Sequence, residues 1–284
     1  RFLDNVLQDF IDRAPDEMAK ARYSAMRERS VGLGVMGFHS YLQNNMVPFE
    51  SAMAKALNMN IFKHIQSEVD RASQLLARER GACPDAADYG IMERFSNKTA
   101  IAPTASISTI CGGTSPGIEP IAANVFNHKT LSGNTAVRNP ALKALLIEKG
   151  QDNEDVWTSI TLNEGSVQHL SFLSDDEKAV FKTAFELDQR WVVELAADRA
   201  PFITQAQSVN IFLPADVHKR DLHQIHYQAW KKGLKSLYYC RSKSLQRAEV
   251  VESTSQRKAK KEAEQLMLAA SASTTDYEEC LACQ

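Results

Sequence analysis

The stretch from Ala102 to Pro120 constrains this chain more than any other. The apolar segment 99–102 runs directly into Pro103, which is followed by small and hydroxyl residues and then by a turn at Gly112-Gly113. A strand that ends in such residues and turns into a short helix presents free N–H groups, and the helix dipole favours negative charge there. A phosphate is the natural candidate ligand. The simpler alternative is a Ser/Thr/Gly-rich surface loop, since turn residues cluster wherever chains reverse.

Helical periodicity is strongest between Pro48 and Arg80. Apolar residues form one stripe there with charges opposite, and Gly81 with Pro84 just beyond it marks the end. The stripe consists of Leu57, Ile61, Ile65, Val69, Ala72 and Leu76. A packing helix is expected near the start of the chain, where Phe2, Val6, Leu7 and Phe10 have helical spacing. The capping box Ser174–Glu177 predicts the start of another helix. Further helices are expected at residues 140–149, around 191–196 and at 221–232. Residues 209–213 and 235–240 are predicted strands, and 124–134 is a polar, turn-rich connection.

The segment from Gly32 to Gly37 matches the G-x-G-x-x-G fingerprint of dinucleotide-binding sites. That fingerprint should follow a strand, open a helix and have an acidic residue about 20 positions on. Here a charged helical stretch precedes the glycines, and no downstream strand ends in an acid at the right distance. We interpret the segment as a short buried strand whose glycines allow close backbone packing.

Composition limits the classes of function. The 284 residues carry a formal net charge of −2, so nucleic-acid binding has no electrostatic support. No apolar run approaches the ~20 residues of a membrane helix, and the first residues lack the organisation of a signal peptide. Five cysteines, an odd number in a long chain, favour a reducing compartment. We expect a cytoplasmic protein without nucleic-acid or membrane partners. Since the chain begins at Arg1 and not at Met, we also expect a fragment, a processed piece or one half of a split subunit.

Four sequence blocks resemble one known family in order and spacing. They are the segment from Pro103 to Pro120, Arg29–Phe38, Lys235–Ser242, and the terminal Cys280-Leu281-Ala282-Cys283-Gln284. Together they resemble the C-terminal part of the large, catalytic subunit of class I ribonucleotide reductases. The resemblance implies an α/β fold, the C-terminal portion of a ten-stranded α/β barrel, over residues 1–245, with a flexible tail at 246–284.

The resemblance also implies site residues. In the family, the loop corresponding to Pro103, Thr104, Ala105, Ser106 and Ile107 cradles the substrate phosphates. Tyr238 and Tyr239 correspond to the large-subunit end of a radical relay, for which a phenol suits because oxidation and proton loss can be coupled. Without the resemblance, adjacent tyrosines are ordinary packing residues. Neighbouring side chains on a regular strand point to opposite faces, so a relay requires local distortion or a strand end here.

The last motif is the pair Cys280 and Cys283. A lone C-x-x-C without a second pair or a His cluster makes a poor zinc site, and it does not open a helix as a thioredoxin motif would. Two thiols on a tether suit disulfide exchange with a buried partner and then with an external reductant. In the family such a tail re-reduces the active-site disulfide, with thioredoxin or glutaredoxin as reductant. The alternative is an incidental cysteine pair.

Several parts of the family's machinery are missing from the sequence. We find no finger-loop cysteine for the radical, no oxidisable cysteine pair and no effector regions, and Cys111 lies too close behind the phosphate loop to be the radical cysteine. His223 and His226 lie one helical turn apart without an evident third ligand, so we expect no metal site. The metal-radical cofactor is expected in a separate small subunit, and the N-terminal part of the large subunit in a companion chain.

The resemblance therefore implies a ribonucleoside-diphosphate reductase large subunit, C-terminal part, inactive alone. It would act on ribonucleoside diphosphates by radical chemistry for DNA precursor synthesis. Two alternatives remain open: a non-catalytic assembly or regulatory remnant of the same fold, and a thiol-redox adaptor that uses only the tail.

Overall fold

Extended segments lie side by side and parallel at the centre of the molecule. The computed structural model describes residues 1–130, 133–214 and 216–242. The parallel pairs are Leu33 with Thr99, Ile101 with Gln207, and strand β3 (Ile211–Leu213) with strand β4 (Cys240–Ser242). Helices occupy the connections between these segments, as expected for parallel strands that need crossover connections. This is an α/β arrangement, as predicted.

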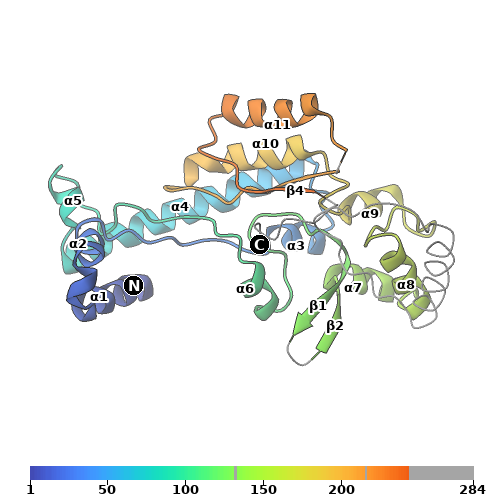
Figure 1. Ribbon diagram of the computed structural model, residues 1–284, viewed down its shortest axis with the longest axis horizontal. Helices are drawn as coiled ribbons and strands as arrows, with labels where there is room; N and C mark the ends of the chain where they lie inside the picture. Colours follow the sequence, from blue (N-terminus) through green and yellow to red (C-terminus); the bar gives the residue numbers. More distant parts are fainter. Residues whose placement is uncertain (131–132, 215, 243–284) are drawn as a thin grey trace, which may run out of the picture.

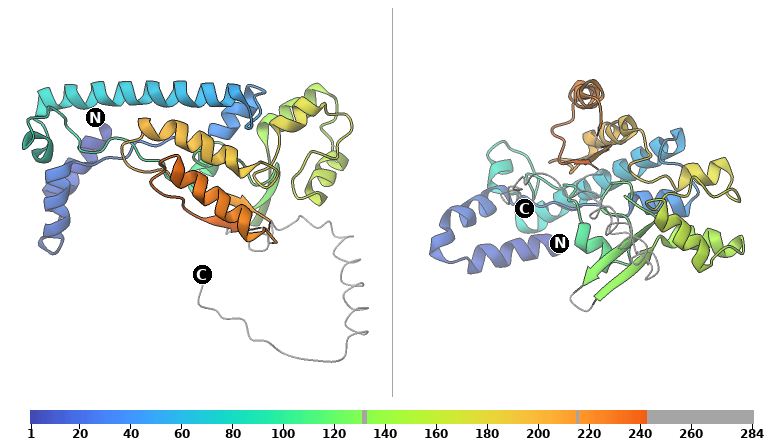
Figure 2. Two further views of the ribbon diagram at one scale, coloured as in Figure 1. Left: turned by 90° about the horizontal axis from the view of Figure 1, so that it is seen from above. Right: turned by 45° about the vertical axis from the view of Figure 1, so that its right-hand side comes forward.

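Three helices stack beside the parallel segments. Helix α10 (Gln189–Arg199) lies between α4 (Ala52–Arg80) and α11 (Lys219–Lys231), as Figures 1 and 2 show. The main hydrophobic core fills the space between these helices, α3 (Phe38–Asn44) and β3. Its fully buried members include Leu42, Phe62, Leu195 and Ile211. The core therefore fixes the position of β3 and of the strand paired with it.

Helix α4 confirms the predicted long helix and part of the predicted apolar stripe, since Leu57 and Ile61 are partly buried and pack against the main core. Ser51 caps its start, and the helix ends at Gly81, whose φ of 89° is in the left-handed region. Of the predicted stripe only Leu76 is buried, and Ala72 is exposed. The buried face instead consists of Ala54, Asn58, Phe62, Ser73, Leu76 and Ala77. Two polar residues belong to it because their partners are internal: Asn58 donates to the Leu195 carbonyl, and the Ser73 hydroxyl accepts from the Arg94 amide.

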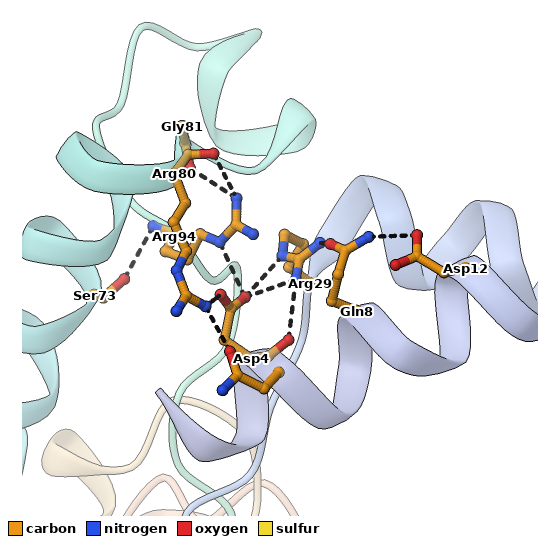
Figure 3. A network of polar contacts seen from close by, with 9 residues as sticks. Asp4, Gln8, Asp12, Arg29, Ser73, Arg80, Gly81 and Arg94 are labelled. Atoms are coloured by element: carbon orange, nitrogen blue, oxygen red, sulfur yellow. Dashed lines mark hydrogen bonds and ion pairs between the residues drawn. The ribbon is translucent and has the colours of Figure 1, made fainter.

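One end of α4 carries a small helical unit held by an ion-pair cluster. This unit consists of α1 (Phe2–Arg13), the short helices η1 (Asp16–Met18) and α5 (Pro84–Ala87), and α2 (Ala19–Glu28) (Figure 1). The expected packing face of α1 is wrong at two positions, because Phe2 is 76% and Val6 53% exposed. The buried residue of α1 is Asp4, whose carboxylate receives hydrogen bonds from Arg29, Arg80 and Arg94 (Figure 3). The charge cluster thus joins this end of α4 to α1, alongside buried apolar side chains such as Leu76, Ala77 and Cys83.

The other end of the molecule has its own hydrophobic core. It packs α7 (Pro140–Glu148), α8 (Glu154–Leu162) and α9 (Asp175–Val180) beside a hairpin of β1 (Val125–Thr130) and β2 (Gly133–Arg138). The segment 124–134, interpreted from the sequence as a polar, turn-rich connection, contributes all of β1 and the first residues of β2. The capping box is confirmed, with Ser174 and Glu177 each bonding the other's backbone amide.

Residues 32–37 are extended beside the 99–101 segment, with Leu33 bridged to Thr99, but the prediction of a buried strand is wrong, because Gly32, Leu33 and Gly34 are exposed. A Cβ at Gly34 would lie 2.8 Å from the Ala100 carbonyl oxygen, so only glycine lets the two backbones approach this closely. Helix α3 begins directly after Gly37. Strand β3 begins at Ile211, two residues later than predicted. The prediction of a strand at 235–240 is largely wrong, because β4 covers Cys240–Ser242 and overlaps the predicted range only at Cys240. Within the described ranges no helix combines the length and apolarity needed to cross a bilayer.

Candidate functional site

The predicted phosphate loop leaves the sheet at the carboxyl end of the 99–101 segment. Pro103 and Thr104 lead into the short helix α6 (Ala105–Ile110), and Thr104 adopts a left-handed conformation with φ of 55°. The Thr104 hydroxyl oxygen accepts a 2.7 Å hydrogen bond from the Gly117 amide. A Cβ at Gly117 would lie 2.9 Å from the Ala102 carbonyl oxygen. The chain beyond α6 therefore folds back tightly onto the start of the loop.

The first turn of α6 is open to solvent. Ala105, Ser106 and Ile107 are all exposed, while Ser108 is buried and donates to the Ala105 carbonyl. The first N–H groups of a helix have no acceptor within it, so an anion can approach them here. The assignment of residues 103–107 to substrate phosphates stays a prediction.

The rings of Tyr238 and Tyr239 lie against one another in a tilted arrangement. Their ring centroids are 4.1 Å apart with an interplanar angle of 55°, and each residue is about half exposed, at 51% and 55%. A hydrogen bond between the two phenols is the main cause that raises the pKa of Tyr238 above its usual value. Adjacent side chains on a regular strand could not meet in this way.

A bulge explains why the rings meet. The Tyr238 amide donates to the Val209 carbonyl, and the Ile211 amide donates to the Tyr239 carbonyl, so both tyrosines lie opposite Asn210 alone. Cys240 then pairs with Ile211 in regular register. Two residues opposite one define a β-bulge, which re-aims side chains and leaves one residue without its ladder bonds. The local distortion that the relay hypothesis requires is present.

The register places the tyrosines and the phosphate loop at one edge of the sheet. Ile101 pairs with Gln207, and Asn210 lies three residues further along that strand, about 10 Å at the usual rise. Asn210 is therefore beyond the end of the 99–101 segment, where Pro103 leaves the sheet. The bulge opposite Asn210 is at this same edge.

A buried carboxyl group lies between the loop and the bulge. Glu119 is 7% exposed, and its Oε1 accepts a 2.5 Å hydrogen bond from Nδ2 of Asn210, which is fully buried. The Oδ1 of Asn210 accepts a 2.9 Å bond from the Tyr239 amide. Burial raises the pKa of Glu119 to about 7, against the opposing effects of the Arg241 charge and the Asn210 hydrogen bond. The Arg241 guanidinium lies 5.8 Å from the centroid of the Tyr239 ring.

The cysteines and histidines of the described ranges are not gathered at this edge into a metal site. Cys83 is buried, Cys111 and Cys240 are exposed, and Cys280 and Cys283 lie outside the described residues. His223 and His226 both face solvent on α11. Among the residues that the structure describes, no three His, Cys, Asp or Glu side chains are grouped to hold a metal ion.

Comparison with known families accounts for this arrangement of strands and loop. The family model described as "Ribonucleotide reductase, barrel domain" matches residues 1–88 and 85–240. This chain belongs to that family. The predicted fold, part of the ribonucleotide reductase α/β barrel, is thereby confirmed.

Individual relatives agree with the family match. The ribonucleoside-diphosphate reductase large subunits of Invertebrate iridescent virus 6 and Invertebrate iridescent virus 3 are 46% and 48% identical to this barrel chain, over 255 and 247 residues. These alignments cover 88% and 86% of the chain but only 26% and 39% of the two relatives. A solved structure, the Actinobacillus ureae class Id ribonucleotide reductase alpha subunit, is similar with a TM-score of 0.78 and 42% identity, covering 85% of this chain and 44% of that one.

Sequence reasoning missed Glu119 and Asn210 as parts of the site. For Glu119 the sequence carried no separate signal beyond its place near the end of the Pro103–Pro120 block. Asn210 carries a clearer signal, because it is an amide within the apolar run 209–213, and a polar side chain buried in a strand must find hydrogen-bond partners.

Proposed function

We propose that this chain is part of the large subunit of a ribonucleoside-diphosphate reductase. In this function the first turn of α6 and the Thr104 hydroxyl receive the phosphates of a ribonucleoside diphosphate. The paired phenols of Tyr238 and Tyr239 pass the radical, and the dithiol Cys280/Cys283 supplies reducing equivalents. The complete reaction reduces the substrate to a 2′-deoxyribonucleoside diphosphate.

The observation that carries the proposal is the bulge that brings two neighbouring phenols together at the edge where the phosphate loop begins. If the two tyrosines served only packing, a regular strand with their side chains on opposite faces would be sufficient. Phenols within hydrogen-bonding reach instead suit transfer of an electron and a proton from one ring to the next. The half-exposed rings and the open turn of α6 leave both features accessible to a partner and a substrate.

The function needs partners. The chain spans 26% and 39% of the first two relatives, so the rest of a large subunit is needed to complete the barrel. A separate small subunit supplies the metal-radical cofactor, and thioredoxin or glutaredoxin reduces the tail. We place the complex in the cytoplasm.

The test is nucleoside diphosphate reduction by this chain mixed with the remainder of a large subunit, a small subunit and a thiol reductant. Tyr239→Phe should abolish turnover, because phenylalanine cannot lose a proton on oxidation. Tyr89→Phe is the matched control. Tyr89 is 83% exposed and follows helix α5, about 150 residues before the bulge in the sequence. Turnover by the Tyr239→Phe mixture would refute the relay, and an inactive parent mixture would favour a non-catalytic remnant.

A further inference from the structure

Two buried side chains connect the phosphate loop with the tyrosine bulge. From the loop, the Thr104 hydroxyl holds the Gly117 amide, and Gly117 is two residues before Glu119. From Glu119 the connection continues through Asn210 to the Tyr239 amide, with hydrogen bonds of 2.5 and 2.9 Å. Since Glu119 and Asn210 are 7% and 0% exposed, each is shielded from bulk solvent, and removing one leaves a buried polar group of the other without its partner.

The Asn210 side chain completes the bulge. A bulge leaves an N–H group without its ladder partner, and here that group is the amide of Tyr239. Asn210 is the residue opposite the bulge, and its own side-chain oxygen takes up this N–H. The hydrogen bond holds the extra residue in place, so that both rings remain on one face.

Glu119 fixes the orientation of the Asn210 amide. An asparagine side chain can present either its oxygen or its NH₂ group, and only the oxygen can accept from Tyr239. Because a carboxylate oxygen accepts the Nδ2–H, the opposite end of the amide must face the bulge. The Arg241 guanidinium, whose Nε has no hydrogen-bond partner among the described residues, adds a positive charge on the side of the Tyr239 ring.

We propose that Glu119 and Asn210 are positioning residues for radical transfer. They hold the Tyr238–Tyr239 bulge in place and connect it with the phosphate loop. This inference rests on the proposed function for what the tyrosines do. The locking itself is a property of the chain and can be measured without turnover.

The first experiment measures amide hydrogen exchange of the full chain, with Tyr239 as the reporter. Asn210→Ala and Glu119→Ala should speed exchange at Tyr239 at least about fivefold, the equivalent of one lost hydrogen bond of about 1 kcal/mol. Exchange at Leu42, in the core, reports whether the variant is folded. Unchanged exchange at Tyr239 in a folded variant would overturn the lock.

The second experiment measures nucleoside diphosphate reduction by the assembled complex. Glu119→Ala should lower kcat at least about tenfold, because small displacements of reacting groups are costly, while KM changes less than about threefold since the α6 amides remain. Glu119→Gln, which keeps an acceptor oxygen, should restore most of kcat. Glu148→Ala and Glu148→Gln, at an exposed glutamate of α7, are the matched controls.

The outcomes separate the two proposals. An active parent complex whose kcat is unaffected by Glu119→Ala, or is lowered equally by Glu119→Gln, would overturn the positioning role and leave the reductase function intact. A parent complex without turnover would overturn the reductase function and, with it, a role in radical transfer.

Discussion

Replacing Asp4 by asparagine tests whether the ion-pair cluster holds the N-terminal helices. The Asp4 side chain is 1% exposed, and Arg29, its 2.6 Å partner, is 5% exposed. Arg94 is also largely buried, with 3.0 Å from its Nε to the Asp4 carboxylate, and Arg80 adds a 2.7 Å contact. Asn keeps the shape but removes the negative charge, so the arginines lose their buried counter-ion. Removing one partner of a buried ion pair typically costs about 3–5 kcal/mol, and we expect a loss in this range.

The assay is urea unfolding at pH 7, followed by far-UV circular dichroism, together with amide exchange in α1. Asp9→Asn is the control, because Asp9 is on the same helix but its carboxylate is 63% exposed and pairs with Arg13. An exposed i,i+4 pair contributes only about 0.5 kcal/mol. Exchange in α1 should rise strongly in Asp4→Asn and little in Asp9→Asn.

The effect of Asp4→Asn must also depend on pH. Burial acts to raise the pKa of Asp4, but hydrogen bonds from Arg94, Arg29 and Arg80 outweigh it and hold that pKa below its usual value. Unfolded Asp titrates near ~3.9, so this stabilisation is complete above about pH 5 and is lost as pH falls through the lower folded pKa. The gap between parent and Asp4→Asn should therefore close in acid. A difference from Asp9→Asn below about 1 kcal/mol at pH 7, or a pH-independent gap, would refute the reasoning.

Two further predictions concern the sheet and the core. Gly34→Ala places a Cβ 2.8 Å from the Ala100 carbonyl oxygen and should lower the free energy of unfolding by about 1–3 kcal/mol. Gly32→Ala is the control and should lower it less, because the nearest atom to its Cβ is the Ala100 methyl at 3.1 Å. Equal Tm values for the two variants would contradict the close strand approach. Burial lowers the pKa of His39 to about 3, so stability should fall as pH decreases from the unfolded value of about 6.5 towards 3, because only the unfolded chain takes up the proton. His39→Asn, which retains an acceptor for the Ile121 amide, should flatten Tm against pH over this range, and an unchanged slope would exclude His39 as its source.

Local patterns predicted the helices well because helix ends depend on neighbouring residues. The capping box at Ser174 and the stop at Gly81 are signals within a few positions of the helix end. The buried face of α4 was not predictable in this way. Asn58 and Ser73 are buried because the Leu195 carbonyl and the Arg94 amide, both distant in sequence, provide their hydrogen bonds. Periodicity of apolar residues carries no information on such partners.

The two tyrosines were predicted as a functional pair through resemblance, whereas the bulge that brings them together could not be. Its location depends on the register of Ile211 with Cys240, which is set by packing between segments about 30 residues apart. The hydrogen-bond pattern around Asn210 reveals it only once the strands are paired. The position of residues 103–107 directly after an apolar segment is a property of one continuous stretch and could be read from the sequence, while their role in phosphate binding, assigned through resemblance, stays a prediction.

The bulge, the buried amide and the buried acid are best understood as consequences of one requirement. Two adjacent aromatic rings can share a face only if the strand carries an extra residue, because side chains otherwise alternate. The extra residue leaves the partly buried Tyr239 amide without its ladder partner, and an amide without an acceptor costs up to about 1–3 kcal/mol where it is shielded from water. Asn210 offsets this cost with its side-chain oxygen, and its NH₂ group then needs an acceptor, which Glu119 provides. Each polar residue in this edge of the sheet thus follows from the one before it, beginning with the paired phenols.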